Sequence, residues 1–171
     1  MAISEAEKVV EAFKVNFRDE WLAMMQRKLG LIGNDDGDQQ LIWDLLEWMS
    51  SSGADYTNTF YLLSNFNILS HSFYNKPQFL SWYERWESRL QRIEVNQSEA
   101  QNMMKKYNPV YIPRNHKVEE ALDAAEDKGD FSILENFLNV LSQPYEETSG
   151  DSSFMEPRPD GMSDYKTYCG T

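Results

Sequence analysis

Hydrophobic residues recur along most of this chain at intervals of three and four, the period of one face of an α-helix. In the first segment the apolar positions are Val10, Phe13, Phe17, Trp21 and Met24. Ser4 and Glu7 precede them with the spacing of a capping box. Gly30 is placed for a left-handed helix end, with Leu31 as the hydrophobic contact beyond it. The pattern predicts a first helix between Ser4 and Leu29.

Two further helices are predicted after a turn rich in Asn, Asp and Gly at residues 34–38. Asp38 could cap the second helix. Its apolar positions are Leu41, Trp43, Leu45, Trp48 and Met49. Residues 50–53 end this helix, and Asp55 is a plausible cap for a short third helix from Thr57 to Asn65.

A long buried helix is predicted from Pro77, because proline suits the first turn of a helix. Its apolar stripe is Phe79, Tyr83, Trp86, Leu90 and Ile93. Asn96 and Glu99 repeat the capping-box spacing ahead of a fifth helix. That helix ends at Asn108, because the residue before Pro109 avoids the helical region.

A helical hairpin is predicted next. Pro113 starts a helix that Gly129 terminates, and Asp130 caps a final helix that runs through Leu141. After Pro144 the chain has repeated Ser, Asp, Gly and Pro with no sustained period, as in an extended tail. The predicted fold class is all-α: an irregular helical domain of about six to seven helices over residues 1–144, ending in the hairpin, and an extended C-terminal tail over 145–171.

Composition narrows the classes of function. With 41% hydrophobic residues and five Trp, the 171-residue chain has a globular composition. No apolar run approaches the length of a membrane span, and the N-terminus lacks the features of a signal peptide. A lone cysteine fits a reducing compartment, so we expect a cytoplasmic protein. The net charge of −12 argues against a nucleic-acid partner.

Three arginines, Arg85, Arg89 and Arg92, line up at helical spacing as an exception to the acidic balance. A solvated helix face that pairs with acidic neighbours is the interpretation that we favour, because such ion pairs are common on helices. A phosphate or partner site is the alternative.

Several stretches together resemble the selenoprotein O family of protein adenylyltransferases. They are Met25 to Leu31 (MQRKLGL), Asp55 to Phe60 (DYTNTF), Trp82 to Leu90 (WYERWESRL), Asn108 to His116 (NPVYIPRNH) running on to Gly129-Asp130-Phe131, and the terminal Tyr168-Cys169-Gly170-Thr171. Each is weak alone, and their order makes the signal specific. The resemblance covers nearly the whole chain, but only the C-terminal portion of the family.

The resemblance implies a parent enzyme with a protein-kinase-like fold that moves AMP from ATP onto protein hydroxyls, with ATP and Mg²⁺ or Mn²⁺ as cofactors of that full-length parent. The family's catalytic residues precede this segment. We therefore expect no catalytic residue, cofactor or metal site here, and we expect the isolated chain to be inactive. The implied partners are the kinase-like core and the protein substrates of the parent, with no nucleic acid and no membrane. A bacterial origin is favoured, because the animal branch has selenocysteine at the position of Cys169.

Two residue patterns suggest chemistry that their context does not sustain. Asp130-Phe131-Ser132 echoes the metal-binding Asp-Phe-Gly of kinases, yet it lies between two predicted helices and suits a helix cap. His116 and Glu120 lie four residues apart and could form half of a zinc site, but no other His or Cys cluster completes it. Surface or interdomain hydrogen bonding is the favoured role of His116.

The proline-bracketed segment and the last residues are the candidate sites. Tyr111, Ile112, Arg114 and His116 are predicted interdomain contacts, because irregular backbone often marks a contact. If a core normally packs against these helices, the isolated chain should also expose a sizeable hydrophobic patch or cover it by self-association. Cys169 is expected to be accessible and reactive, and the resemblance implies a redox link from it to another cysteine in the kinase-like part.

Two hypotheses follow. In the first, the chain is the helical C-terminal region of a protein adenylyltransferase, supporting and redox-regulating a kinase-like core that lies outside it. In the second, it is a freestanding helical module that binds another protein and has no enzymatic activity.

Overall fold

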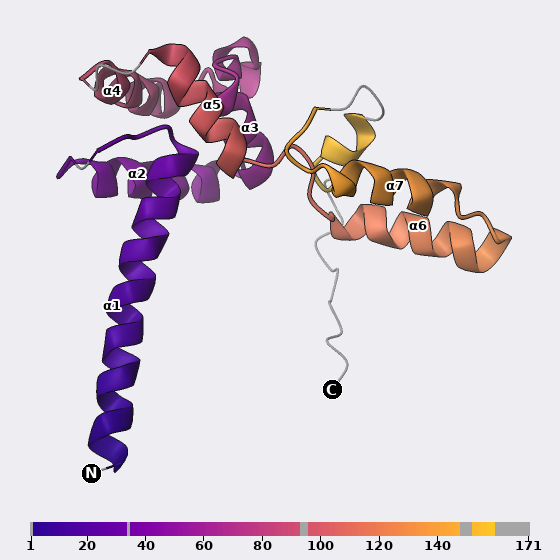
Figure 1. Ribbon diagram of the computed structural model, residues 1–171. Helices are drawn as coiled ribbons and strands as arrows, with labels where there is room; N and C mark the ends of the chain where they lie inside the picture. Colours follow the sequence, from indigo (N-terminus) through magenta and orange to yellow (C-terminus); the bar gives the residue numbers. More distant parts are fainter. Residues whose placement is uncertain (1, 34, 93–95, 148–151, 160–171) are drawn as a thin grey trace. The chain divides into compact units, whose positions relative to one another are not determined.

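A computed structural model describes residues 2–33, 35–92, 96–147 and 152–159, and within these ranges it contains helices and no strand (Figure 1). The all-α prediction is therefore confirmed. The helices are α1 (Ala2–Lys28), α2 (Asp38–Ser52), α3 (Tyr56–Ser64), α4 (Pro77–Arg92), α5 (Gln97–Tyr107), α6 (Asn115–Lys128) and α7 (Ser132–Ser142). Short 3₁₀ turns are η1 (Ile68–Ser70), η2 (Ser72–Tyr74) and η3 (Ser152–Met155).

The chain forms two units, Met1–Pro109 (unit 1) and Val110–Thr171 (unit 2). The predicted division into 1–144 and 145–171 concerns a functional domain and its tail, and it stays a prediction. In unit 1, α1 packs on α2 and α5, α2 on α4, and α3 on α5.

The aromatic residues of α4 organise the core of unit 1. Phe79, Trp82 and Trp86 are at most 2% exposed. Each indole also satisfies its N–H, which a buried tryptophan requires. Trp82 Nε1 donates to the Leu41 carbonyl at 2.8 Å, and Trp86 Nε1 donates to the Leu29 carbonyl at 2.9 Å. Trp86, from the stripe predicted on this helix, therefore contacts the end of α1, and Trp82, which the predicted stripe did not include, contacts the start of α2. Ile93, the last position of that stripe, lies outside the described residues.

Several predicted helix ends are confirmed, and three of them in unit 1 show their local cause. Asp55 caps α3 by accepting the backbone N–H of Asn58 at 2.8 Å. Asn96 and Glu99 form the reciprocal capping box of α5. Gly30 follows α1 with φ of +71°, and the buried Leu31 donates its N–H to the Gln26 carbonyl at 2.9 Å. These motifs are local, so the sequence was sufficient to place them.

Other predicted ends were wrong or shifted. α1 already includes Ala2, so Ser4 lies inside the helix and does not begin it. Asp38 is the first residue of α2, whose N-cap is Gly37, because the Asp38 carboxylate is held by a distant arginine. α6 begins at Asn115, two residues after Pro113. α3 spans Tyr56–Ser64 in place of Thr57–Asn65, a one-residue shift that is ordinary for helix ends.

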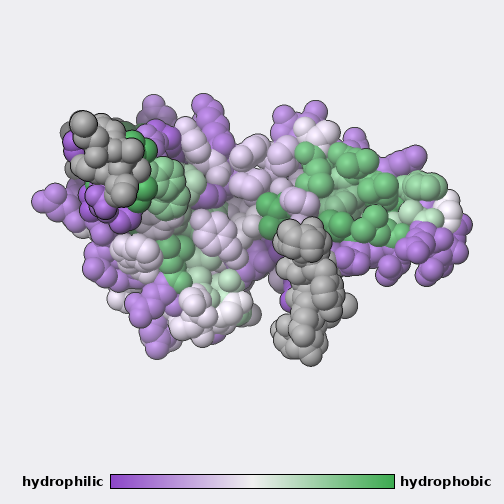
Figure 2. Space-filling view, turned by 90° about the horizontal axis from the view of Figure 1, so that it is seen from below, coloured by the Kyte–Doolittle hydropathy of each residue, from purple (hydrophilic) through white to green (hydrophobic). Residues whose placement is uncertain are grey.

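Unit 2 is built on the predicted hairpin. Gly129 ends α6 with φ of +64°, and α7 returns along α6. Phe137 of α7 stacks on Phe154 of η3 with ring centroids 5.0 Å apart, and both side chains are buried. The described part of the tail therefore packs on α7 at this point. Figure 2 shows a hydrophobic area over the hairpin. Leu122 of α6 and Leu138 of α7 are both exposed.

Candidate functional site

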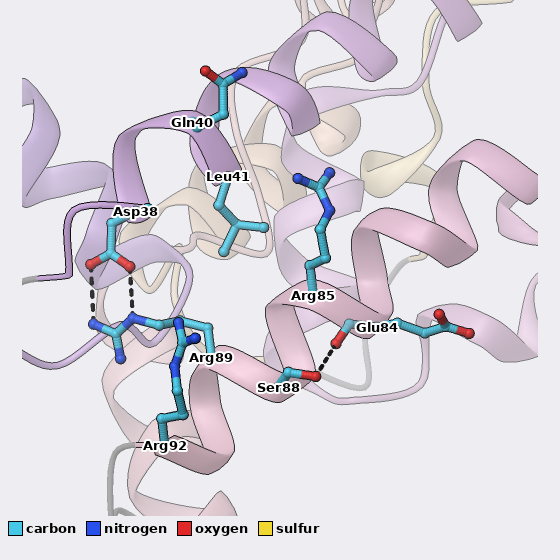
Figure 3. Close-up of a pocket in the computed structure, with 9 residues that line it drawn as sticks. Asp38, Gln40, Leu41, Glu84, Arg85, Ser88, Arg89 and Arg92 are labelled. Carbon is cyan, nitrogen blue, oxygen red and sulfur yellow. Dashed lines mark hydrogen bonds and ion pairs between the residues drawn. The ribbon is translucent and has the colours of Figure 1, made fainter.

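A hollow of about 530 Å³ lies between α2 and α4 of unit 1 (Figure 3). Its lining comes from the start of α2 and from the second half of α4, and it includes all three arginines singled out in the sequence. Side chains at i, i+4 and i+7 share one side of a helix, so Arg85, Arg89 and Arg92 reach the same region. This hollow is the part of unit 1 where an anion site would be sought first.

Arg89 is the buried member of this set. Its side chain is 6% exposed, and that of Asp38 is 2% exposed. Arg89 Nε donates to Asp38 Oδ1 at 2.7 Å, and Arg89 Nη2 donates to Asp38 Oδ2 at 3.1 Å. Gln26 Nε2 also donates to Asp38 Oδ2 at 2.9 Å, and the carbonyl oxygen of Ile32 accepts from Arg89 Nη2 at 3.2 Å. A bidentate guanidinium–carboxylate pair with further hydrogen bonds is the geometry that a buried ion pair requires.

The two outer arginines are also paired with aspartates. Arg85 Nη1 lies 2.7 Å from Asp44 Oδ2, and Arg92 Nη2 lies 3.0 Å from Asp35 Oδ2. The prediction of a helix face paired with acidic neighbours is thus confirmed for all three arginines. The expectation that this face is solvated is wrong for Arg89, because Arg89 follows Trp82 and Trp86 on the buried side of α4.

The same contacts shift the pKa values of Asp35 and Asp44, the two aspartates that pair with the outer arginines. The Gly37 N–H, 2.9 Å from Asp35 Oδ1, lowers the pKa of that carboxyl, and the arginines of α4 lower it further. Burial tends to raise the pKa of Asp44, but hydrogen bonds from Gln40 and Arg85 outweigh this and leave it lowered. Each arginine in the hollow is therefore paired with an aspartate. This neutralisation favours a structural role, which is to hold the α1–α2 loop against α4.

A second polar cluster joins the ends of three helices around the buried Asn108. Its Nδ2 donates to the Lys28 carbonyl and to Ser64 Oγ, both at 2.8 Å. Lys28 Nζ in return donates to Asn108 Oδ1 at 3.0 Å and lies over the Phe60 ring at 5.0 Å. Burial lowers the pKa of this lysine. Asn108, which follows the end of α5, therefore also joins α5 to α1 and α3 through these hydrogen bonds.

The predicted interdomain contacts lie at the start of unit 2. Tyr111 is 2% exposed and Arg114 is 9% exposed, whereas Ile112 and His116 are half-buried. The backbone N–H groups of Val110 and Tyr111 both donate to the Pro144 carbonyl, at 2.7 and 3.2 Å. The segment is thus tied to the end of α7. The interdomain role of these four residues stays a prediction.

His116 is the titratable group of this segment. Burial lowers its pKa, and the charges of Lys117 and Arg114 lower it further, against an opposing effect of Glu120. The imidazole is therefore neutral near pH 7 and can both donate and accept a hydrogen bond.

The remaining candidates have simpler outcomes. Asp130 accepts the Ser132 N–H at 3.0 Å, as the helix-cap interpretation requires, although the N-cap position itself is Phe131. Within residues 2–33, 35–92, 96–147 and 152–159, no group of three or more His, Cys, Asp and Glu side chains could hold a metal ion. Cys169 lies outside the described residues.

Among the residues that the structure describes, no helix is long and apolar enough to cross a membrane.

Sequence reasoning missed the partners of Asp38 and Asn108. One signal was available for the first: Arg89 follows Trp82 and Trp86 at intervals of seven and three, which places it on the apolar side of α4. A cation there needs a buried acid, and Asp38 is one of the aspartates of the preceding turn. No comparable local signal marks Asn108, whose contacts are 44 and 80 residues away.

Comparisons with known proteins give a consistent result. A family model described as protein adenylyltransferase SelO matches residues 1–142. The chain is 41% identical over 170 residues to the protein nucleotidyltransferase YdiU of a Bacillus cereus strain (the Bacillus cereus relative), covering 99% of this chain and 35% of that protein. It is 42% identical over 171 residues to the protein of the same name from Bacillus mycoides, with the same two coverages. The chain thus spans about a third of the length of these relatives.

Proposed function

Because this chain belongs to the protein adenylyltransferase SelO family, we propose that it is a non-catalytic helical region of an enzyme that transfers AMP from ATP to protein hydroxyls. In this proposal it supports a kinase-like core that lies in the remainder of the full-length protein. The observation that carries the proposal is the extent of the match, which takes in 99% of this chain but 35% of the relative.

The described side chains support the non-catalytic assignment. Arginines are the side chains best suited to hold the phosphates of a nucleotide, and the three in the hollow of unit 1 are already bound by Asp35, Asp38 and Asp44. The three arginines of the hollow therefore do not fit the phosphates of the ATP that the family uses. No step of the transfer runs through these arginines, and nucleotide and metal belong to the core.

The proposed setting is a bacterial cytoplasm, with the kinase-like core and the protein substrates of the parent as partners. The charge of −12 supports partners other than nucleic acid or an anionic membrane surface. Cys169 is proposed as the redox residue that links this region to the core. Its expected reactivity is tested by thiol titration of native and denatured protein, and a thiol that reacts only after unfolding contradicts that role.

A fusion protein tests the proposed function. The part of the Bacillus cereus relative that this chain does not match is joined to this chain, which replaces the relative's own matching part. Transfer of radiolabelled AMP from ATP to protein is then measured for the fusion, the intact relative and this chain alone.

We expect activity from the fusion and the intact relative, and none from this chain alone. An active isolated chain contradicts the non-catalytic assignment. An inactive fusion beside an active relative contradicts the supporting role and favours the freestanding interaction module.

A further inference from the structure

The N-terminal half of α1 carries an apolar stripe that is open to solvent. Every residue from Glu7 to Glu20 is exposed. Val10, Phe13 and Phe17, at intervals of three and four, share one face of the helix and are 53%, 67% and 61% exposed. In Figure 1 this half of α1 extends well beyond the other helices of unit 1.

The stripe meets the core of its own unit at Trp21, which is partly buried, whereas its earlier positions Val10, Phe13 and Phe17 are exposed. It continues to Met24, in the half of α1 that does pack, and Met24 is still 36% exposed there. Met25, the next residue and about 100° further round the helix, is 1% exposed. At the same level Trp21 stacks on Trp43 of α2 at 5.0 Å, and Trp43 is 50% exposed. The stripe is therefore open from Val10 to Phe17 and meets α2 at Trp21.

Such a face needs a partner for two physical reasons. Contiguous exposed apolar surface on a water-soluble protein marks an interaction site. A run of exposed helical residues from Glu7 to Glu20 is also marginally stable in water, because most helix stability in proteins comes from packing. Phe13 and Phe17 are stacked on each other at 6.1 Å, so they present one continuous surface.

We propose that this stripe, Val10, Phe13, Phe17 and Met24 with the Trp21–Trp43 pair, is the surface that docks on the part of the full-length protein outside this chain. The inference rests on the proposed function and names its contact surface. About two thirds of the relative's length lies outside the match, which supplies an occupant on the same polypeptide. A second copy of this chain is disfavoured, because each copy carries a net charge of −12.

The flanks of the stripe indicate how it docks. Lys14 lies 2.6 Å from Glu11, and Arg18 lies 3.4 Å from Asp19, so these charges are paired within α1. Docking therefore depends on apolar packing and not on charge attraction. We expect the facing surface of the core to be apolar and the affinity to change little with salt concentration.

Co-purification of separate polypeptides tests the docking surface. The probe is the non-matching part of the Bacillus cereus relative, co-expressed with this chain as wild type, as Phe13→Ser/Phe17→Ser, or as Val15→Ser. Val15 is the matched control, because it is 50% exposed on α1 but lies about 200° round the helix from Phe13. Hydrogen exchange of residues 7–20 is measured in the same complexes.

We expect wild type and Val15→Ser to bind the probe equally, with residues 7–20 protected from exchange. Phe13→Ser/Phe17→Ser should bind about 100-fold more weakly, since each phenylalanine would lose its buried area. Equal binding by wild type and the double variant overturns the docking surface and leaves the proposed function intact.

The fusion protein separates the two proposals if the co-expressed halves do not associate. An active fusion whose residues 7–20 exchange freely overturns the docking surface alone, and one that protects them supports it. An inactive fusion overturns the proposed function, and the docking surface with it. Self-association of this chain that Phe13→Ser/Phe17→Ser abolishes identifies a second copy as the occupant and also overturns the inference.

Discussion

Substitution of Asp38 by asparagine should destabilise unit 1 strongly. The change keeps the size of the side chain but removes the negative charge that faces the buried guanidinium of Arg89. Breaking one partner of a buried ion pair costs about 3–5 kcal/mol, because the remaining charge is left uncompensated. The Ile32 and Gly33 carbonyls, 3.2 and 3.4 Å from Arg89 Nη2, still accept hydrogen bonds. We therefore expect the lower end of that range, about 3 kcal/mol.

Urea unfolding followed by tryptophan fluorescence measures this loss. The five tryptophans all lie between residues 21 and 86, so the signal reports unit 1. Asp44→Asn is the control, because its partner Arg85 is 51% exposed, and it should cost about 1 kcal/mol or less. The double variant Asp38→Asn/Arg89→Met should recover most of the stability, since it removes the orphaned charge.

Two results would refute this reasoning. If Asp38→Asn unfolds at the same urea concentration as Asp44→Asn, the pair is not buried in solution. If the double variant is no more stable than Asp38→Asn alone, the loss does not come from an uncompensated charge.

Three further substitutions are checked by the same unfolding measurement. Gly30→Ala should cost about 1–2 kcal/mol, because the backbone at Gly30 is left-handed. The loss should exceed that of Gly53→Ala, which has the same backbone but open space around it, whereas a Cβ at Gly30 would meet Met104 at 3.3 Å. Equal losses contradict this. Asn108→Ala should cost about 1–3 kcal/mol, because it leaves the Lys28 carbonyl without its buried donor; a loss below 0.5 kcal/mol, roughly the net worth of one exposed hydrogen bond, contradicts it. Asp35→Asn should lower stability at pH 6 but not at pH 2, because the folded-state pKa of Asp35 is lowered and its contribution is lost as the pH falls through that value; a pH-independent difference contradicts it.

The helices were predictable because their signals are local. The capping box at Asn96 and the left-handed glycine at position 30 each fix a helix end through residues within one turn. The failed caps show the limit of this approach. Asp38 has the right residue type and position for a cap, but Arg89, 51 residues away, holds its carboxylate. A charge-assisted pair in a buried site is stronger than a cap hydrogen bond, and nothing local to Asp38 reports it.

Periodicity also could not tell which apolar stripe is covered. The stripes of α1 and α4 have the same spacing, yet Phe79 and Trp86 are buried whereas Phe13 and Phe17 are more than 60% exposed. Spacing gives the face of a helix, and the partner for that face depends on the rest of the polypeptide. Tyr111 and Arg114, which were predicted as contacts from irregular backbone, are buried in this chain, and their interdomain role stays a prediction.

Calorimetric titration of the isolated chain with ATP and Mg²⁺ tests the central proposal, that this helical region lacks the nucleotide site of the proposed full-length enzyme. The fusion with the remainder of the Bacillus cereus relative is titrated in parallel. We predict binding heat from the fusion and none from the isolated chain, because the arginines of its hollow are bound by aspartates. Micromolar affinity of the isolated chain for ATP would contradict the account.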